Sequence, residues 1–252
     1  MGPRRPEAPR GARVAGGVDP EGSGSGRGLL VGQIGPANPR RHSGGGSRRL
    51  KRAADLTLAG VALLVVLPLL AILGVLIRLT SPGPVLFRQT RMGRDGVPFQ
   101  CLKLRTMVPD AQVRLSTDAD LRRRHRENGF KLPTGSDPRV TGLGGFLRRW
   151  HLDELPQLWN VVRGDISLVG PRPIEPDQYE AWLEADPEAW EVLTVPPGVF
   201  GAWTAQGRSR VDEPERIRVE ISYTRRWSVW SDAIILVRHL PVLLRGQEDR
   251  AS

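Results

Sequence analysis

Cysteine is almost absent from this chain, which has one, Cys101, among 252 residues. A single thiol excludes an internal disulfide and any zinc site built from several cysteines. The four histidines are scattered and show no metal-ligand spacing. The sequence also lacks a P-loop and a dinucleotide-binding glycine fingerprint, so a nucleotide would have to be recognised by other means.

Aromatic and periodic apolar residues are nearly missing from residues 1–50, which consist largely of Gly, Pro, Arg and Ser. Such a segment cannot bury enough apolar surface to offset its ordering entropy, so we expect residues 1–50 to form a disordered basic tail. Residues 1–52 hold 11 Lys+Arg and 3 Asp+Glu, which gives +8 of the net charge of +10. Because this basic stretch leads directly into an apolar one, it indicates anionic lipid on the cytoplasmic leaflet rather than nucleic acid.

The run from Leu56 to Ile77 contains no charged residue and is long enough to cross a bilayer core of ~30 Å as a helix. Pro68 stands near its middle, where proline removes a backbone hydrogen bond and bends a helix. Basic residues flank both ends, and positive flanks stay on the cytoplasmic side. The pattern predicts a re-entrant membrane helix over 51–80, bent at Pro68; a kinked spanning helix is the alternative.

A short β-hairpin is expected after this helix. Val85–Phe87 is typical of a strand, Arg88–Gly96 of a basic turn, and Phe99–Met107 of a second strand on which Lys103 and Arg105 alternate on one face. Cations on such a hairpin could bind phosphates. They could equally serve only to protect a strand edge from pairing with another chain.

A helix start near Pro156 organises the next segment, because proline is excluded from a helix interior. An apolar stripe from 155 to 162 predicts one packed face, made by Leu155, Leu158, Trp159 and Val162. Asp153, Gln157 and Asn160 fall together on the opposite face.

Asp153 and Glu154 lie at the N-terminal end of this helix, where the helix dipole favours negative charge and keeps at least one carboxylate ionised. An ionised aspartate on the polar face is a candidate nucleophile or metal ligand. The plainer interpretation is that acidic residues are simply common in first turns.

Two further helical patterns, 214–227 and 229–245, follow near the end. The second is too polar to span a membrane but suits lying in the interface, with Trp227 and Trp230 at headgroup depth. The predicted fold class is therefore α+β: a membrane re-entrant helix followed by a compact cytoplasmic α/β catalytic domain over 81–247, with the hairpin and interfacial amphipathic helices.

Lys51 to about Arg245 resembles the bacterial sugar transferase family, the small monotopic phosphoglycosyl transferases. The resemblance rests on several ordered motifs: Lys51-Arg52, Ser81-Pro82-Gly83-Pro84, Phe87-Arg88-Gln89, Lys103-Leu104-Arg105-Thr106-Met107, Leu152-Asp153-Glu154-Leu155-Pro156-Gln157-Leu158, Asn160-Val161, Gly164-Asp165-Ile166-Ser167, Gly170-Pro171-Arg172-Pro173, Pro197-Gly198 and Gly207-Arg208.

The resemblance implies transfer of a sugar 1-phosphate from a UDP-sugar to polyprenyl (undecaprenyl) phosphate at the inner membrane, releasing UMP and starting exopolysaccharide or other glycan assembly. Asp153 matches the family nucleophile, which forms a covalent phosphosugar intermediate, and Glu154 is its partner. Both are expected to hold Mg²⁺, which offsets repulsion between carboxylate and diphosphate. The expected phosphate-binding cations are Arg88, Lys103, Arg105, Arg172 and Arg208.

Three positions depart from the family pattern. Leu67 precedes Pro68 where Ser is frequent, His151 occupies a position where Ser often caps the helix, and Glu220 replaces a usual Asp. A different class of function remains open: a membrane-anchored, non-catalytic module that binds anionic lipid or polymer and has no use for Asp153. A hydrolase that passes the phosphosugar to water is a second alternative.

Overall fold

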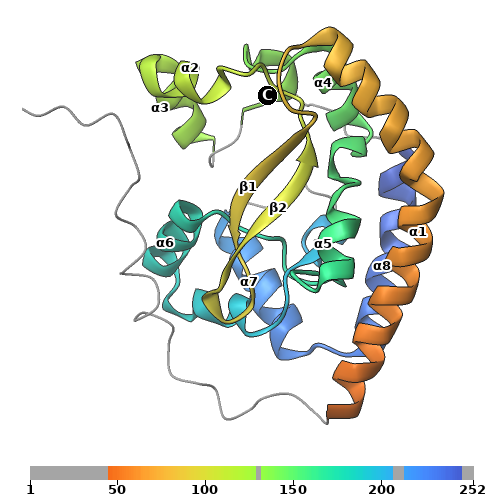
Figure 1. Ribbon diagram of the computed structural model, residues 1–252. Coiled ribbons are helices and arrows are strands. Elements are labelled where there is room, and N and C mark those ends of the chain that lie inside the picture. Colours follow the sequence, from red (N-terminus) through yellow and green to blue (C-terminus); the bar gives the residue numbers. More distant parts are fainter. Residues whose placement is uncertain (1–44, 129–131, 207–212, 246–252) are drawn as a thin grey trace, which may run out of the picture. The chain divides into compact units, whose positions relative to one another are not determined.

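The computed structural model describes residues 45–128, 132–206 and 213–245, and Figure 1 shows their elements. Helices and strands are mixed, as the α+β prediction requires. The helices are α1 Gly45–Thr80, α2 Ala111–Thr117, α3 Ala119–Glu127, α4 Gly142–Arg149, α5 Gln157–Arg163, α6 Pro176–Ala185, α7 Glu213–Arg225 and α8 Val229–Arg245. The strands are β1 Leu86–Met92, β2 Pro98–Leu104, β3 Ser167–Val169 and β4 Gly198–Phe200. Short 3₁₀ segments are η1 Arg94–Gly96, η2 Thr134–Ser136, η3 Leu152–Glu154, η4 Pro187–Thr194 and η5 Thr204–Gln206.

Helix α1 is a single, continuous helix that curves along its length and contains Pro68 in its interior (Figure 1). It begins at Gly45, so the prediction that residues 45–50 are disordered was wrong; the rest of the predicted tail lies outside the described residues. One face is buried, with Ala59 and Leu73 fully packed, while Leu64 on the other face is 73% exposed. Within the described ranges, α1 is the one helix long and apolar enough to cross a membrane.

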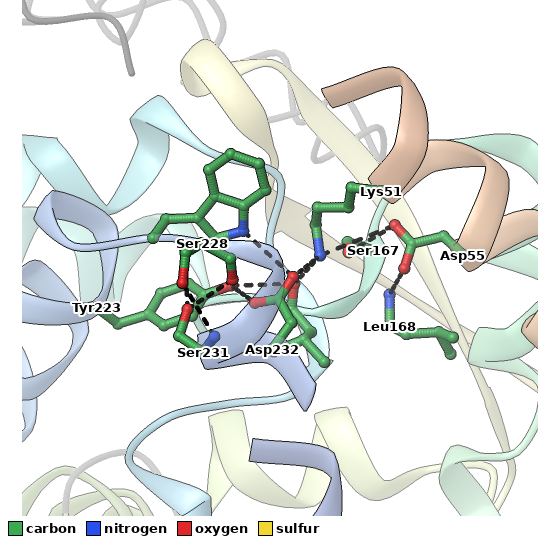
Figure 2. Close-up of polar contacts among 10 residues, drawn as sticks. Lys51, Asp55, Ser167, Leu168, Tyr223, Ser228, Ser231 and Asp232 are labelled. Carbon is green, nitrogen blue, oxygen red and sulfur yellow. Dashed lines mark hydrogen bonds and ion pairs between the residues drawn. The ribbon is translucent and has the colours of Figure 1, made fainter. Parts of the chain in front are cut away.

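Polar contacts fasten the start of α1 to the rest of the chain (Figure 2). Lys51 forms an ion pair with Asp232 at the start of α8 and donates to the Val169 carbonyl of β3 at 3.0 Å. Asp55, one turn later, accepts from the Ser167 hydroxyl at 2.8 Å and from the Leu168 amide at 3.2 Å. These partners are buried, so each polar group that α1 brings into the interior is matched rather than left at full desolvation cost.

The neighbouring Arg52 donates to the carbonyls of Val161 and Val162, at 2.6 and 2.8 Å, in the last turn of α5. A guanidinium at a helix C-terminus satisfies orphan carbonyls and favours the negative end of the helix dipole. Lys51 and Arg52 were interpreted above as lipid-facing charges. That interpretation was wrong for these two residues, because both bind the protein itself.

Strands β1 and β2 pair antiparallel, with Phe87 opposite Lys103 and Gln89 opposite Cys101. The first strand continues to Met92, so the predicted basic turn from Arg88 onward was placed too early: the tight reversal occupies residues 93–97. Extension of β1 has a functional consequence, because alternation along a strand puts Arg91 on the same face of the hairpin as Gln89.

Strands β3 and β4 pair in parallel, with Ser167 opposite Gly198. A Cβ on Gly170 or Gly198 would collide with backbone atoms of the other segment, so this approach requires glycine at both positions. The Gly170-Pro171-Arg172-Pro173 corner leaves β3 from this close crossing. Its position is therefore set by backbone packing.

Candidate active site

Asp153 and Glu154 lie in η3, the short 3₁₀ turn that precedes α5. The chain reaches this turn through His151, whose φ of 56° is in the left-handed region that side chains rarely adopt. No side chain caps η3, which agrees with the departure noted at His151. Pro156 then stands immediately before α5, so the prediction of a helix start within a turn of Pro156 is confirmed.

The polar face of α5, which lies opposite the predicted apolar stripe, is also buried. Asn160 is 1% exposed and binds the hairpin, accepting from the Leu102 amide at 2.9 Å and donating to the Gln100 carbonyl at 2.8 Å. Trp159, predicted to pack, is 48% exposed, and Val161 takes its place in the core. Asn160 thus fixes the carboxylate-bearing segment against β2.

Glu154 is surrounded by cations. Its Oε1 lies 2.7 Å from Nη2 of Arg172 and 3.8 Å from Nζ of Lys103. The charge of Glu154 raises the pKa of Arg172, whereas burial lowers the pKa of Lys103. The hairpin, η3 and the Pro-Arg-Pro corner, distant in sequence, therefore meet at one carboxylate, and four predicted site residues, Asp153 included, come together.

Asp153 is 8% exposed, and within the described residues its side chain makes no direct hydrogen bond or ion pair. Burial, and next the charge of Glu154, raise the pKa of Asp153 to about 6. Lys103, Arg148 and Arg172 act in the opposite direction. The helix dipole is thus outweighed by burial, yet Asp153 remains mostly ionised at pH 7. A buried anionic oxygen without a bonded partner has the properties of a nucleophile.

Arg91 and Arg148 were not predicted as site residues. Arg91 donates to the Pro173 carbonyl at 3.0 Å and forms an ion pair with Glu175 at 3.1 Å. Arg148, at the end of α4, donates to the Thr106 hydroxyl at 2.9 Å, and its charge lowers the pKa of Asp153. The alternation of β1 carried through to residue 91 would have indicated Arg91.

Two predicted phosphate-binding cations lie elsewhere. Arg88 is exposed on β1, on the face of the hairpin opposite Lys103, because its cross-strand partner is Leu102. Arg105 donates to the Ser81 carbonyl at 2.6 Å and packs on Gly83, just after α1, where it supports a loop. The structure thus places neither side chain beside Asp153 and Glu154, and phosphate binding by Arg88 and Arg105 stays a prediction. Arg208 lies outside the described residues.

The expected Mg²⁺ ion has two candidate carboxylate ligands, Asp153 and Glu154. Among the described residues no group of three His, Cys, Asp or Glu side chains is arranged to hold a metal. Mg²⁺ commonly takes one or two carboxylates and completes its shell with waters and substrate phosphates. Burial, and next the charge of Glu154, disfavour the ionised form of Asp153, and a bound cation would favour it. The pair fits Mg²⁺ held jointly with a phosphorylated substrate.

The pKa of Asp153 predicts a pH dependence for any reaction that needs the ionised carboxylate. Because this pKa is raised to about 6, the ionised fraction is full above neutrality and is lost as the pH falls through 6. The kcat/KM for the UDP-sugar expected from the sequence should fall about tenfold between pH 7 and pH 5. An aspartate with an ordinary pKa would keep nearly full activity at pH 5, so a flat pH dependence down to that value would contradict the assignment.

Comparison with known proteins identifies one matching family, the bacterial sugar transferases, over residues 46–246. A relative from Salmonella typhimurium, named undecaprenyl-phosphate galactose phosphotransferase, is 38% identical over 79% of this chain and 41% of its own length. UDP-glucose:undecaprenyl-phosphate glucose-1-phosphate transferase of Escherichia coli is 38% identical over 76% of this chain and 39% of its own length.

A third relative, the exopolysaccharide production protein ExoY of Rhizobium meliloti, is 35% identical over 77% of this chain and 84% of its own length. The chain thus spans about two fifths of the length of the first two relatives but most of the third. All of the described site residues fall within the matched family region.

Proposed function

The chain belongs to the bacterial sugar transferase family, and from that premise we propose that it transfers a sugar 1-phosphate from a UDP-sugar to undecaprenyl phosphate. The observation that carries this proposal is the pairing of buried Asp153 with half-buried Glu154, beside which lie Arg172 and Lys103. Named relatives act on undecaprenyl phosphate with galactose or glucose donors, and one serves exopolysaccharide production. We place the product of this chain at the start of such a glycan.

In the first step, an ionised oxygen of Asp153 attacks the phosphorus that carries the sugar. A bond forms between this oxygen and phosphorus, and the bond from phosphorus to the oxygen of the UMP phosphate breaks, so UMP leaves with the electron pair. In the second step, a phosphate oxygen of undecaprenyl phosphate attacks the same phosphorus and displaces the Asp153 carboxylate. Splitting the transfer in this way uses one carboxylate twice.

The neighbouring cations favour both displacements. Lys103 and Arg172 lie beside Glu154, where they can bind diphosphate oxygens and balance the charge that develops on the leaving phosphate. Asp153 and Glu154 would hold Mg²⁺, which supplies Lewis-acid stabilisation of the phosphoryl oxygens when bound. Burial limits water at Asp153, which favours transfer to the lipid over hydrolysis.

We further propose that α1 enters and leaves the inner membrane on the cytoplasmic side. Its two ends support this arrangement, because Lys51 near one end binds α8 while Ile77 near the other packs in a cluster with Leu104 and Leu147. A helix that crossed the bilayer would carry these ends to opposite sides, away from a common domain. The exposed apolar face of α1 would then contact lipid.

Accessibility of cysteines tests this topology. In a Cys101→Ala background, Gly46→Cys before the apolar run and Val97→Cys in the hairpin turn should both resist an impermeant thiol reagent in intact cells. Both should react after permeabilisation, since both positions are exposed in the fold. Labelling of only one in intact cells would show a spanning helix. Pro68→Ala, which restores the missing backbone donor, should shift part of the population toward spanning.

The activity is tested by incubating the full chain in nanodiscs with Mg²⁺, undecaprenyl phosphate and a panel of UDP-sugars. UMP and a lipid-linked sugar diphosphate should appear together with at least one donor. UMP accompanied by free sugar phosphate, without a lipid product, would indicate a hydrolase. Absence of UMP with every donor would favour a non-catalytic module that binds anionic lipid or polymer.

A further inference from the structure

The backbone of the Pro-Arg-Pro corner is held from three directions. The Pro171 carbonyl accepts from the amide of Gly198, the first residue of β4, at 2.8 Å. The Pro173 carbonyl accepts from Arg91 of β1 at 3.0 Å. Between them, the Arg172 amide donates to Oε1 of Glu220, in α7, at 3.4 Å. Pro171 and Pro173, on either side of Arg172, each have a fixed φ. Together with these hydrogen bonds they determine the position of the Arg172 backbone, and therefore of its Cα and Cβ.

The contact between Glu220 and the Arg172 amide has no part in the two displacement steps. Its side chain is fully buried, in a helix whose other buried residues include Ile217 and Ile221. A buried carboxylate is costly unless it serves a bonding role. Its Oε1 faces the corner and the turn at Gly201, where a Cβ would lie 3.4 Å away, and its Oε2 has no hydrogen-bond partner among the described residues.

From these contacts we infer that Glu220 is a positioning residue, which holds the backbone of Arg172 so that its guanidinium meets Glu154 and the donor phosphates. The inference rests on the proposed function, because Glu220 touches neither Asp153 nor Glu154. A continuous path runs from the Glu220 carboxylate to the Arg172 amide, and from the Arg172 guanidinium to Glu154 Oε1 at 2.7 Å. Loss of the contact between Glu220 and the Arg172 amide would displace the Arg172 guanidinium from Glu154. Small displacements of an active-site group lower the reaction rate strongly.

The charge of Glu220 is set by its surroundings. Burial raises the pKa of Glu220 to about 7, while Arg216 on the preceding turn and then Arg172 act to lower it. Arg216 is itself held between the rings of Trp182 and Trp203, at 4.9 and 4.5 Å from their centroids. The ionised carboxylate is the stronger acceptor for the Arg172 amide. Gln at this position would keep an acceptor oxygen, whereas Met would keep the length and remove it.

Hydrogen exchange tests the contact without relying on catalysis. The peptide that spans residues 170–175 has few amides, because positions 171 and 173 are prolines, so exchange at Arg172 is readily isolated. Glu220→Met should accelerate this exchange at least about tenfold, and Glu220→Gln should do so less. Glu191→Gln is the matched control. Glu191 is another buried carboxylate, and it binds Arg225, which lies in α7 as Glu220 does. Unchanged exchange in Glu220→Met would overturn the inference whatever its activity.

A double-mutant cycle then tests the functional link. Glu220→Met should lower kcat for UMP release about 10- to 100-fold, Glu220→Gln should recover part of that loss, and Glu191→Gln should stay near the wild-type rate. In an Arg172→Ala background, Glu220→Met should add little further loss, because both act through one side chain. Losses that multiply would show that Glu220 acts independently of Arg172. Absence of UMP from the wild-type chain would refute the proposed function instead, and the exchange experiment would still decide the contact.

Discussion

Asp153→Asn is expected to abolish UMP release, by about four decades in rate or more, because it keeps the size of the side chain and removes the attacking oxygen's charge. The fold should survive this change. Burial raises the pKa of Asp153 to about 6, so its ionised form is disfavoured in the folded chain, and a neutral amide at that position removes the penalty. The measurement is initial-rate UMP formation, accompanied by a thermal unfolding curve that should show no loss of stability.

A matched control is Asp177→Asn, since Asp177 also lies in a first helical turn, that of α6, but is exposed. It should retain wild-type activity. If Asp153→Asn were active with every donor that the wild type uses, the carboxylate would be a binding group and the nucleophile would have to be sought elsewhere.

Arg172→Lys should lower kcat by about two to three decades, although the positive charge is kept. The planar guanidinium of Arg172 bonds Glu154 Oε1 at 2.7 Å and retains further donors for phosphate oxygens. Lysine presents a point charge on a different stem and cannot reproduce this fork. The rate of UMP release under saturating donor is the appropriate measurement, because the contact is expected to matter most in the transition state.

Arg225→Lys offers the comparison for Arg172→Lys. Arg225 makes a forked pair with both carboxylate oxygens of Glu191, through Nε at 2.9 Å and Nη2 at 2.8 Å, away from the corner. Its replacement by lysine should affect stability slightly and leave the rate of UMP release near the wild-type value. Wild-type activity in Arg172→Lys would mean that Arg172 only packs the corner and that another cation binds the phosphates.

The parts of the site that sequence reasoning could predict are those written in short local patterns. Pro156 indicated the start of α5, because an α-helix accommodates proline only in its first turn. The start of α5 in turn indicated the place of Asp153 and Glu154. The Pro-Arg-Pro corner indicated Arg172 through family resemblance. Lys103 was likewise indicated by the family resemblance, since strand alternation alone left a role in protecting the strand edge equally open. Each inference needed only a few adjacent residues.

The errors concern partners far apart in sequence. Lys51 and Asp232 are separated by 181 positions, so nothing near Lys51 indicated a buried partner in place of lipid. Trp159 looked like a core residue from helical periodicity, yet the seven-residue α5 packs through Val161 and anchors itself through Asn160. Burial of Asp153 likewise depends on tertiary packing, which reversed the pKa direction expected from the helix dipole alone.

The central claim is that Asp153 carries the phosphosugar between the two substrates, and the most direct measurement omits the lipid acceptor. Full chain, Mg²⁺ and a UDP-sugar labelled in its sugar phosphate should release UMP in a burst of about one equivalent. Denaturation and peptide mapping should place the label on the peptide containing Asp153, and Asp153→Asn should carry none. If labelled protein never forms, and UMP appears only when undecaprenyl phosphate is also bound, the acceptor attacks the donor directly and the covalent account is wrong.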